Sequence, residues 1–246
     1  MTSINWTVKR AVVVGASGGL GEAFVDHLVV RPGIEQVYAL SRSGVTHASG
    51  LVTSLITNYE QPETLARAAD TIETDGPLDL IIVATGLLHA DDGFGPEKSL
   101  RDIEADRLAR AYLVNAIGPA LAAKNFLPLL NREGKTVFAA LSARVGSISD
   151  NRIGGWYGYR AAKSGLNQLL KTASIEHARR WRHTAIIGLH PGTVDTGLSK
   201  PFQRNVADSK LFTPEFSAGS LLSVIDGITS KDTGKVFDWA GEEVPA

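Results

Sequence analysis

Two side chains one helical turn apart, Tyr159 and Lys163, have the types and spacing needed to pass a proton to or from an oxygen atom. They lie in the run Tyr157-Gly158-Tyr159-Arg160-Ala161-Ala162-Lys163, and a spacing of four residues places both on one face of a helix. A free tyrosine, with a pKa of about 10, is a poor acid-base group at neutral pH, but a nearby ammonium favours the phenolate. We therefore expect the pair to exchange a proton with a carbonyl or alcohol oxygen. The alternative is an ordinary exposed helix pair.

A glycine-rich stretch near the amino end has the pattern of a phosphate-binding turn. The apolar run Val12-Val13-Val14 leads into Gly15-Ala16-Ser17-Gly18-Gly19-Leu20-Gly21, and an amphipathic helix follows. Glycines allow the backbone to turn close to a pyrophosphate, and the free N–H groups at the helix start point at the anion. The alternative is a tight turn that binds nothing. We expect a dinucleotide to contact the residues of this turn: Gly15, Ser17, Gly18, Gly19, Leu20 and Gly21.

The end of the second strand-like run indicates which dinucleotide is bound. Ser41 and Arg42 stand where a carboxylate would bind the ribose hydroxyls of NAD. A carboxylate would repel a 2′-phosphate, whereas a hydroxyl can bond to it and a guanidinium can pair with its charge. NADP(H) is therefore favoured over NAD(H), with a solvated loop cation as the alternative for Arg42. After the third run, Asn58 could accept a bond from the adenine amino group.

Strand-like and helix-like segments alternate along almost the whole chain. Seven apolar runs read as strands, at Ala11–Val14, Gln36–Leu40, Leu51–Ile56, Leu78–Ala84, Thr136–Leu141, Thr184–Leu189 and Lys235–Trp239. Helical spacing occupies Glu22–Val30, Glu63–Ile72, Leu100–Leu130, Tyr159–Arg180 and Pro214–Ile228. This order predicts an α/β fold, a Rossmann-like doubly wound parallel sheet of seven strands with helices on both faces. No linker divides the chain, so we expect one domain over 1–246, with a cofactor half at about 1–150 and a substrate-loop and catalytic half at about 151–246.

Composition excludes several classes of function. The 246 residues are 43% hydrophobic and 21% charged and carry a formal charge of −1, which favours a globular protein without affinity for nucleic acid. No apolar run is long enough to span a membrane and no leader segment precedes the first strand, so we expect a cytoplasmic protein without a membrane partner. The chain has no cysteine, and its six histidines lack metal-ligand spacing. We therefore expect no metal.

Four motifs occur together in an order that resembles the short-chain dehydrogenase/reductase family. They are Gly15-x-x-x-Gly19-x-Gly21, Asn115 within Leu113-Val114-Asn115-Ala116-Ile117-Gly118-Pro119, Tyr159-x-x-x-Lys163, and Pro191-Gly192-Thr193-Val194-Asp195-Thr196. Within the family, the segments around 142–151, 154–160 and 189–196 look most like the C-factor and sniffer-type carbonyl reductase branch. The resemblance covers nearly the whole chain.

The resemblance implies a role for each matched residue. Tyr159 would be the catalytic acid/base, Lys163 would lower its pKa and hold the nicotinamide ribose, and Asn115 would keep a water in the proton relay. Without the motif, Asn115 would be read as a helix Asn that bonds to backbone. Thr193 would hold the nicotinamide carboxamide. Further cofactor contacts are implied at Ala84, Thr85, Gly86, Pro191, Gly192 and Thr196.

The implied activity is that of an NADPH-dependent carbonyl reductase or alcohol dehydrogenase acting on a small carbonyl or alcohol. The family also pairs helices across two-fold axes, which implies a homodimer or homotetramer. The alternative function is a nucleotide-binding regulatory or signalling protein of C-factor type with little or no turnover.

Two positions depart from the family pattern. The fourth strand is followed by Ala84-Thr85-Gly86 where the family has Asn-Ala-Gly, and Ala143 stands where the family has the serine that polarises the substrate oxygen. Ser142 and Ser147 are the candidate replacements. We favour Ser147, because side chains alternate along a strand and Ser142 should point to the opposite face. A site without a serine is the third alternative, and losing one such donor can cost about 100-fold in turnover.

Overall fold

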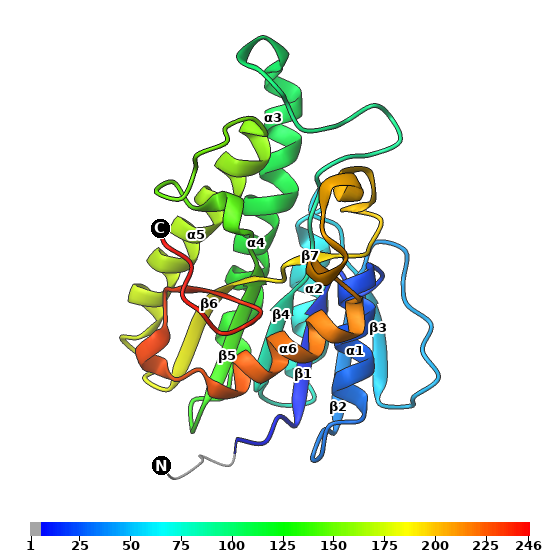
Figure 1. The fold of residues 1–246 in the computed structure, drawn as a ribbon. Coiled ribbons are helices and arrows are strands. Elements are labelled where there is room, and N and C mark those ends of the chain that lie inside the picture. The colour runs from blue at the N-terminus through cyan, green and yellow to red at the C-terminus, as the bar shows by residue number, and fades with distance from the viewer. Residues whose placement is uncertain (1–5) are drawn as a thin grey trace.

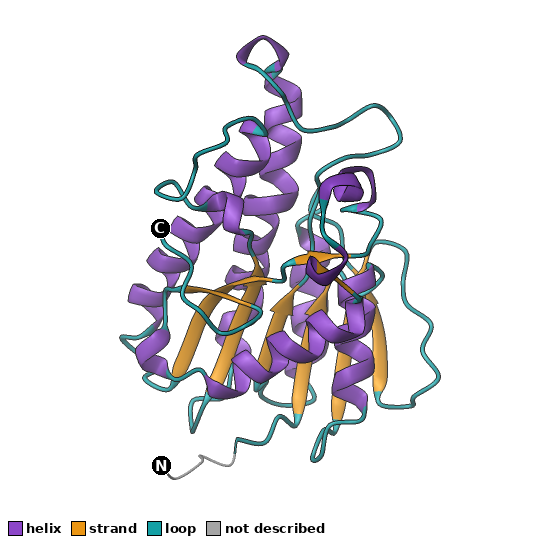
Figure 2. Ribbon diagram, viewed as in Figure 1, coloured by secondary structure: helices purple, strands orange, loops and turns teal. Residues whose placement is uncertain are grey.

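Seven parallel strands form one twisted sheet in the computed structural model, which describes residues 6–246 (Figure 1 and Figure 2). Residues 1–5 of the predicted domain lie outside the described residues. The strand order is β3-β2-β1-β4-β5-β6-β9. The strands are β1 (Arg10–Val14), β2 (Gln36–Ser41), β3 (Val52–Ile56), β4 (Leu80–Val83), β5 (Thr136–Leu141), β6 (Thr184–His190) and β9 (Val236–Asp238). They are the seven strands predicted from the apolar runs, so the predicted fold class is confirmed.

Helices cover both faces of the sheet, which explains why its strands are apolar without alternation. Helices α1 (Gly19–Val29) and α6 (Pro214–Gly227) lie on one face, and α2 (Glu63–Glu73), α4 (Gly118–Phe126) and α5 (Tyr157–His177) lie on the other. Successive β1 residues point to opposite faces. Val13 packs in the cluster that contains Phe24, and Val12 in the cluster that contains Phe126. Each face therefore has its own buried core.

The segment predicted as one helix over Leu100–Leu130 is interrupted. It consists of a 3-10 turn (Leu100–Asp102), α3 (Ala105–Tyr112), a π turn (Leu113–Ile117), α4 and a second 3-10 turn (Leu127–Leu129). The physical reason is Pro119, which has no N–H to donate to the carbonyl of Asn115. The N–H of Gly118 instead bonds the Leu113 carbonyl, which widens the turn that holds Asn115.

A second, two-stranded sheet was not predicted. It pairs β7 (Thr193–Val194) with β8 (Leu211–Phe212), and strands of two residues are too short to show a period in the sequence. Short 3-10 turns at Arg144–Gly146, Lys200–Asn205, Asp208–Lys210 and Ser230–Asp232 complete the described elements.

The chain changes direction within the sheet at β1. Strands β2 and β3 lie on one side of β1, while β4 and the strands that follow lie on the other. In open parallel sheets the loops after such neighbouring strands separate and leave a crevice at their carboxyl ends. The glycine-rich turn after β1 and the Ala84–Gly86 turn after β4 border this crevice.

Candidate active site

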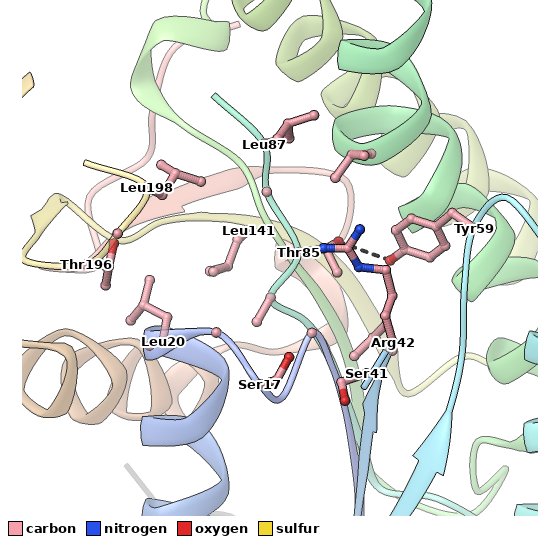
Figure 3. A pocket seen from close by; sticks show the side chains of 18 of the residues that line it. Ser17, Leu20, Ser41, Arg42, Tyr59, Thr85, Leu87, Leu141, Thr196 and Leu198 are labelled. Carbon is pink, nitrogen blue, oxygen red and sulfur yellow. Dashed lines mark hydrogen bonds between the residues drawn. The ribbon is translucent and has the colours of Figure 1, made fainter. Parts of the chain in front are cut away.

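A pocket of about 640 Å³ lies at the carboxyl ends of the strands. Figure 3 shows side chains from the turns after β1, β2 and β4 and from residues 196–198 around one space. Most predicted site residues line it: Gly15, Ser17, Gly18, Gly19, Leu20, Ser41, Arg42, Asn58, Ala84, Thr85, Gly86, Ser142, Tyr159, Lys163, Pro191 and Thr196. Five predicted site residues are outside this lining: Gly21, Asn115, Ser147, Gly192 and Thr193.

The glycine-rich turn is shaped so that only its backbone approaches the pocket. Gly15 has a φ of +86°, in the left-handed region, and donates its N–H to the Leu40 carbonyl at 2.8 Å. A Cβ on Gly21 would lie 2.1 Å from the Gly15 carbonyl oxygen. Gly21 therefore allows α1 to pack against the turn, while Gly18 and Gly19 at the helix start face the pocket. The turn therefore forms a cradle lined by backbone, and side chains in place of its glycines would fill it.

The end of β2 supplies a hydroxyl and a cation to the pocket. Ser41 is buried at 4% exposure, and its hydroxyl has no hydrogen-bond partner among the described residues. Arg42 beside it is exposed and lines the same pocket. A buried hydroxyl without a partner is costly unless a ligand bonds it. Asn58 uses its side-chain oxygen to accept the N–H of Glu60.

Tyr159 and Lys163 lie on the first turns of α5 and share the pocket wall. The Lys163 Nζ atom is 5.7 Å from the centre of the Tyr159 ring and donates a hydrogen bond to the Leu141 carbonyl at 2.6 Å. Burial raises the pKa of Tyr159 to about 12 and lowers the pKa of Lys163 to about 7. Both shifts have the same cause, since desolvation opposes the phenolate of Tyr159 and the ammonium of Lys163, and the lowering of the tyrosine pKa by Lys163 stays a prediction.

The side-chain amide of Asn115 makes its hydrogen bonds to backbone atoms. It donates to the carbonyls of Leu87 at 2.8 Å and Ala111 at 3.0 Å, and it accepts the Leu87 N–H at 3.1 Å. The side chain is fully buried and ties the π turn to the loop after β4. Both amide N–H groups therefore already have acceptors. The predicted role of Asn115 in holding a relay water stays a prediction.

Neither serine candidate offers a free hydroxyl to the pocket. The Ser142 hydroxyl donates to Asn167 Oδ1 on α5 at 2.6 Å. The Ser147 hydroxyl lies outside the pocket lining, donates to the Ala246 carbonyl oxygen at 3.3 Å and accepts the Asp150 N–H at 3.1 Å. The preference for Ser147 over Ser142 stays a prediction, and of the two only Ser142 lines the pocket. These contacts favour the third alternative, a site without a serine.

The segment after β6 meets the pocket only in part. Pro191 and Thr196 line it, whereas Thr193 pairs with Leu211 in the small sheet. Gly192 has a φ of +77°, and a Cβ there would lie 2.6 Å from the Phe212 ring. The β7–β8 pairing thus determines which residues of this motif reach the pocket.

Several pocket residues were missed from the sequence. Leu87, Leu141 and Leu198 give the pocket apolar walls, and the His89 ring bonds the Gly197 carbonyl at 2.8 Å. Tyr59 follows Asn58 directly and also lines the pocket. No motif marks these residues, although their places after β3, β4, β5 and the Pro191 motif could have indicated them.

Within residues 6–246, no helix is both long and apolar enough to cross a membrane.

Comparison with a known protein family agrees with the strand order and the pocket described above. The family model for short chain dehydrogenase matches residues 9–207. The chain belongs to this family. The predicted recognition is confirmed, and with it the expectation of an enzyme of the short-chain dehydrogenase/reductase class.

Individual family members extend the comparison. The chain is 32% identical over 179 residues to C-signal of Myxococcus xanthus, and the match covers 73% of this chain and 99% of that protein. Its fold is similar to the NADPH-bound carbonyl reductase from chicken fatty liver, with a TM-score of 0.85, 22% identity and coverage of 100% and 97% of the two chains. It is also similar to the carbonyl reductase Sniffer of D. melanogaster, with a TM-score of 0.81, 20% identity and coverage of 98% and 100%. The two structures establish the shared fold of this short-chain dehydrogenase/reductase.

Proposed function

We propose that this short-chain dehydrogenase/reductase is an NADP-dependent carbonyl reductase that interconverts a small carbonyl compound and its alcohol, with Tyr159 as the acid/base. The observation that carries the proposal is the common pocket. The Tyr159 and Lys163 pair shares its walls with the glycine-rich turn and with Ser41 and Arg42. A proton-transfer pair next to a dinucleotide cradle fits hydride-transfer chemistry.

The residues present suit NADP(H). Gly15 and Gly19 pack directly on Thr85 and Thr196, since a Cβ on either would lie 2.9 Å from a threonine methyl group, so this turn presents backbone to the pocket where a pyrophosphate could bind. The unpartnered Ser41 hydroxyl and the exposed Arg42 suit a 2′-phosphate, and the residues that end β2 include no carboxylate. The carbonyl reductase from chicken fatty liver, which shares the fold, is described as NADPH-bound. These observations support NADP(H) over NAD(H).

The protein's own part in the reaction is to bind, orient and protonate the substrate. Bound NADPH supplies the hydride that reduces the carbonyl carbon. With a pKa of about 12, Tyr159 is neutral at pH 7 and can give its proton to the alkoxide, a stronger base than phenolate. When charged, the Lys163 ammonium stabilises the phenolate that remains. Since Ala143 supplies no hydroxyl, Tyr159 alone polarises the carbonyl oxygen.

The pocket walls favour a small, largely apolar substrate. Leu87, Leu141 and Leu198 line the same pocket as Tyr159. A ligand pocket of this kind binds through apolar area and takes its specificity from a few polar groups. Comparing turnover across a panel of carbonyl compounds identifies the substrate.

The experiment is to follow NADPH absorbance with a panel of aldehydes and ketones, with NADH in parallel. We expect turnover with NADPH, and we expect Tyr159→Phe to keep its fold and its NADPH affinity while losing about 10²- to 10⁴-fold in kcat. Tyr157→Phe, two residues earlier on the same helix and outside the pocket lining, is the matched control. Undiminished reduction by Tyr159→Phe would contradict the proposed mechanism.

A regulatory role is the second candidate, and the similarity to C-signal together with the missing serine at Ala143 favours it. Tight NADPH binding without turnover across the whole panel would support this candidate.

We also propose one functional domain over 1–246, with its cofactor half before and its catalytic half after about residue 150. A second copy would pack on the groove of about 540 Å³ between α4 and α5, which includes Leu127, Leu170 and Trp181. Location in the cytoplasm stays a prediction.

A further inference from the structure

A partly buried tyrosine, Tyr59, lies in the turn after β3 and faces the turn after β4. Its hydroxyl shares a hydrogen bond of 3.0 Å with the Thr85 hydroxyl (Figure 3). Burial raises the pKa of Tyr59 above its ordinary value, so the phenol stays neutral. Both residues line the pocket, although the bond joins positions 26 apart in the chain.

Thr85 extends this connection to the glycine-rich turn. Its methyl group stands 2.9 Å from where a Cβ on Gly15 would be, so methyl and turn are in direct contact. One face of Thr85 therefore packs on the first turn of the cradle while its hydroxyl bonds Tyr59. The three turns after β1, β3 and β4 are joined through these two side chains.

The ring of Tyr59 is fixed from its other side by α4. A Cβ on Gly118 would lie 2.1 Å from the ring, so the ring packs directly on the Gly118 backbone. The neighbouring Asn115 holds the same helix segment to Leu87. The ring therefore cannot shift toward α4, and this contact holds the hydroxyl where it bonds Thr85.

We propose that Tyr59 is a positioning residue for the nucleotide: its bond to Thr85 holds the β3, β4 and glycine-rich turns at the separation that the cofactor needs. The inference rests on the proposed dinucleotide-binding function. Because the bond joins the turns after β3 and β4 beside the glycine-rich turn, it acts on cofactor affinity rather than on proton transfer. It should affect NADPH and NADH equally, since both have an adenosine moiety, in contrast to Arg42.

The test is a double-mutant cycle on cofactor affinity, measured by calorimetric or fluorescence titration with NADPH and with NADH. A typical intramolecular hydrogen bond corresponds to about a threefold to tenfold change in an equilibrium constant. We expect Tyr59→Phe and Thr85→Val each to raise both Kd values by about that factor. The double variant should be no weaker than either single one, because all three lack the same bond. In steady-state kinetics the loss should appear mainly in the KM for the cofactor, with a smaller change in kcat.

Tyr38→Phe is the matched control. Tyr38 is buried, and its hydroxyl donates to Asp75 at 2.6 Å outside the pocket lining. This control should lower the melting temperature and leave both Kd values unchanged. Kd values for Tyr59→Phe equal to wild type, or changed no more than in Tyr38→Phe, would overturn the inference. Additive losses in the double variant would also overturn it. If the wild type binds neither nucleotide, the proposed function itself fails, and the two failures are distinguishable.

Discussion

The Glu97 carboxylate accepts the backbone N–H of Gly158 at 2.9 Å, across 61 positions of sequence. Gly158 is the second residue of α5, so this buried carboxylate satisfies a helix-start N–H that has no partner within the helix. The Glu97 carbonyl also accepts the Trp156 N–H at 2.6 Å. Trp156 has a φ of 54°, and among residues 6–246 it is the one non-glycine residue with positive φ. Glu97 therefore holds the first turn of α5, where Tyr159 lies.

We predict that Glu97→Ala lowers kcat by about tenfold or more with little change in cofactor KM. The variant leaves the Gly158 N–H at the start of α5 unpaired, so the Tyr159 hydroxyl loses its fixed position, while the Glu97 backbone carbonyl still accepts the Trp156 N–H. Glu97→Gln keeps an acceptor oxygen and should retain most of the activity. Steady-state kinetics of both variants make the comparison. Full activity in a folded Glu97→Ala protein would show that the contact does not position the tyrosine.

The pKa values of the buried pair predict opposite pH dependences for the two directions of the reaction. Reduction needs a protonated Tyr159, with its pKa at about 12, and a charged Lys163, with its pKa at about 7. Its rate should therefore fall above about pH 7 through loss of the ammonium. Oxidation needs the phenolate and should rise with pH. Rates measured in both directions from pH 6 to pH 10 check this, and a reduction rate that rises with pH would contradict it.

The same burial predicts a stability effect in the protein without nucleotide. The pKa of Lys163 is lower in the folded than in the unfolded chain, so the unfolded chain binds more protons between about pH 7 and pH 10.5. Stability then rises with pH through that window. Lys163→Met should therefore melt at a higher temperature than wild type at pH 6. The gain is on the order of 5 kcal/mol at most, less the lost bond to Leu141, and it should vanish near pH 10.5. Melting curves that keep the same difference at every pH would exclude this explanation.

Local patterns in the sequence were sufficient to predict the fold and most of the pocket. The seven strands follow from apolar runs because both sheet faces are covered, and the glycine-rich turn follows from its place between β1 and α1. What could not be predicted depends on contacts between distant segments. Nothing near Glu97 indicates that it caps a helix that begins 60 positions later, and nothing near Tyr59 indicates Thr85 as its partner. The bond of the Ser147 hydroxyl to Ala246 likewise joins positions 99 apart, so nothing near Ser147 in the sequence indicates it.

We predict that Ser147→Ala changes kcat by less than about twofold. The Ser147 hydroxyl bonds the Ala246 carbonyl and the Asp150 N–H, outside the pocket lining, so its loss should lower stability by about 1 kcal/mol and leave the chemistry intact. Ala143→Ser restores a hydroxyl at the position that the family resemblance assigns to it and should raise kcat if that side chain reaches the carbonyl oxygen. Kinetics and thermal melts of both variants are the measurement. A loss of about 100-fold in Ser147→Ala would return Ser147 to the active site.

Arg42→Ala should separate the two nicotinamide cofactors. A charge-assisted bond to a phosphate contributes about 1.5–3 kcal/mol, so the Kd of NADPH should rise about 10- to 100-fold while that of NADH stays nearly constant. Because Arg42 is exposed, the NADPH preference of the wild type should also weaken at high salt. Ser41→Asp is the complementary change, since its carboxylate repels the 2′-phosphate and can accept bonds from the ribose hydroxyls of NADH. Equal losses for both cofactors in Arg42→Ala would mean that the guanidinium does not read the 2′-phosphate, and the preference would then have to come from Ser41 alone.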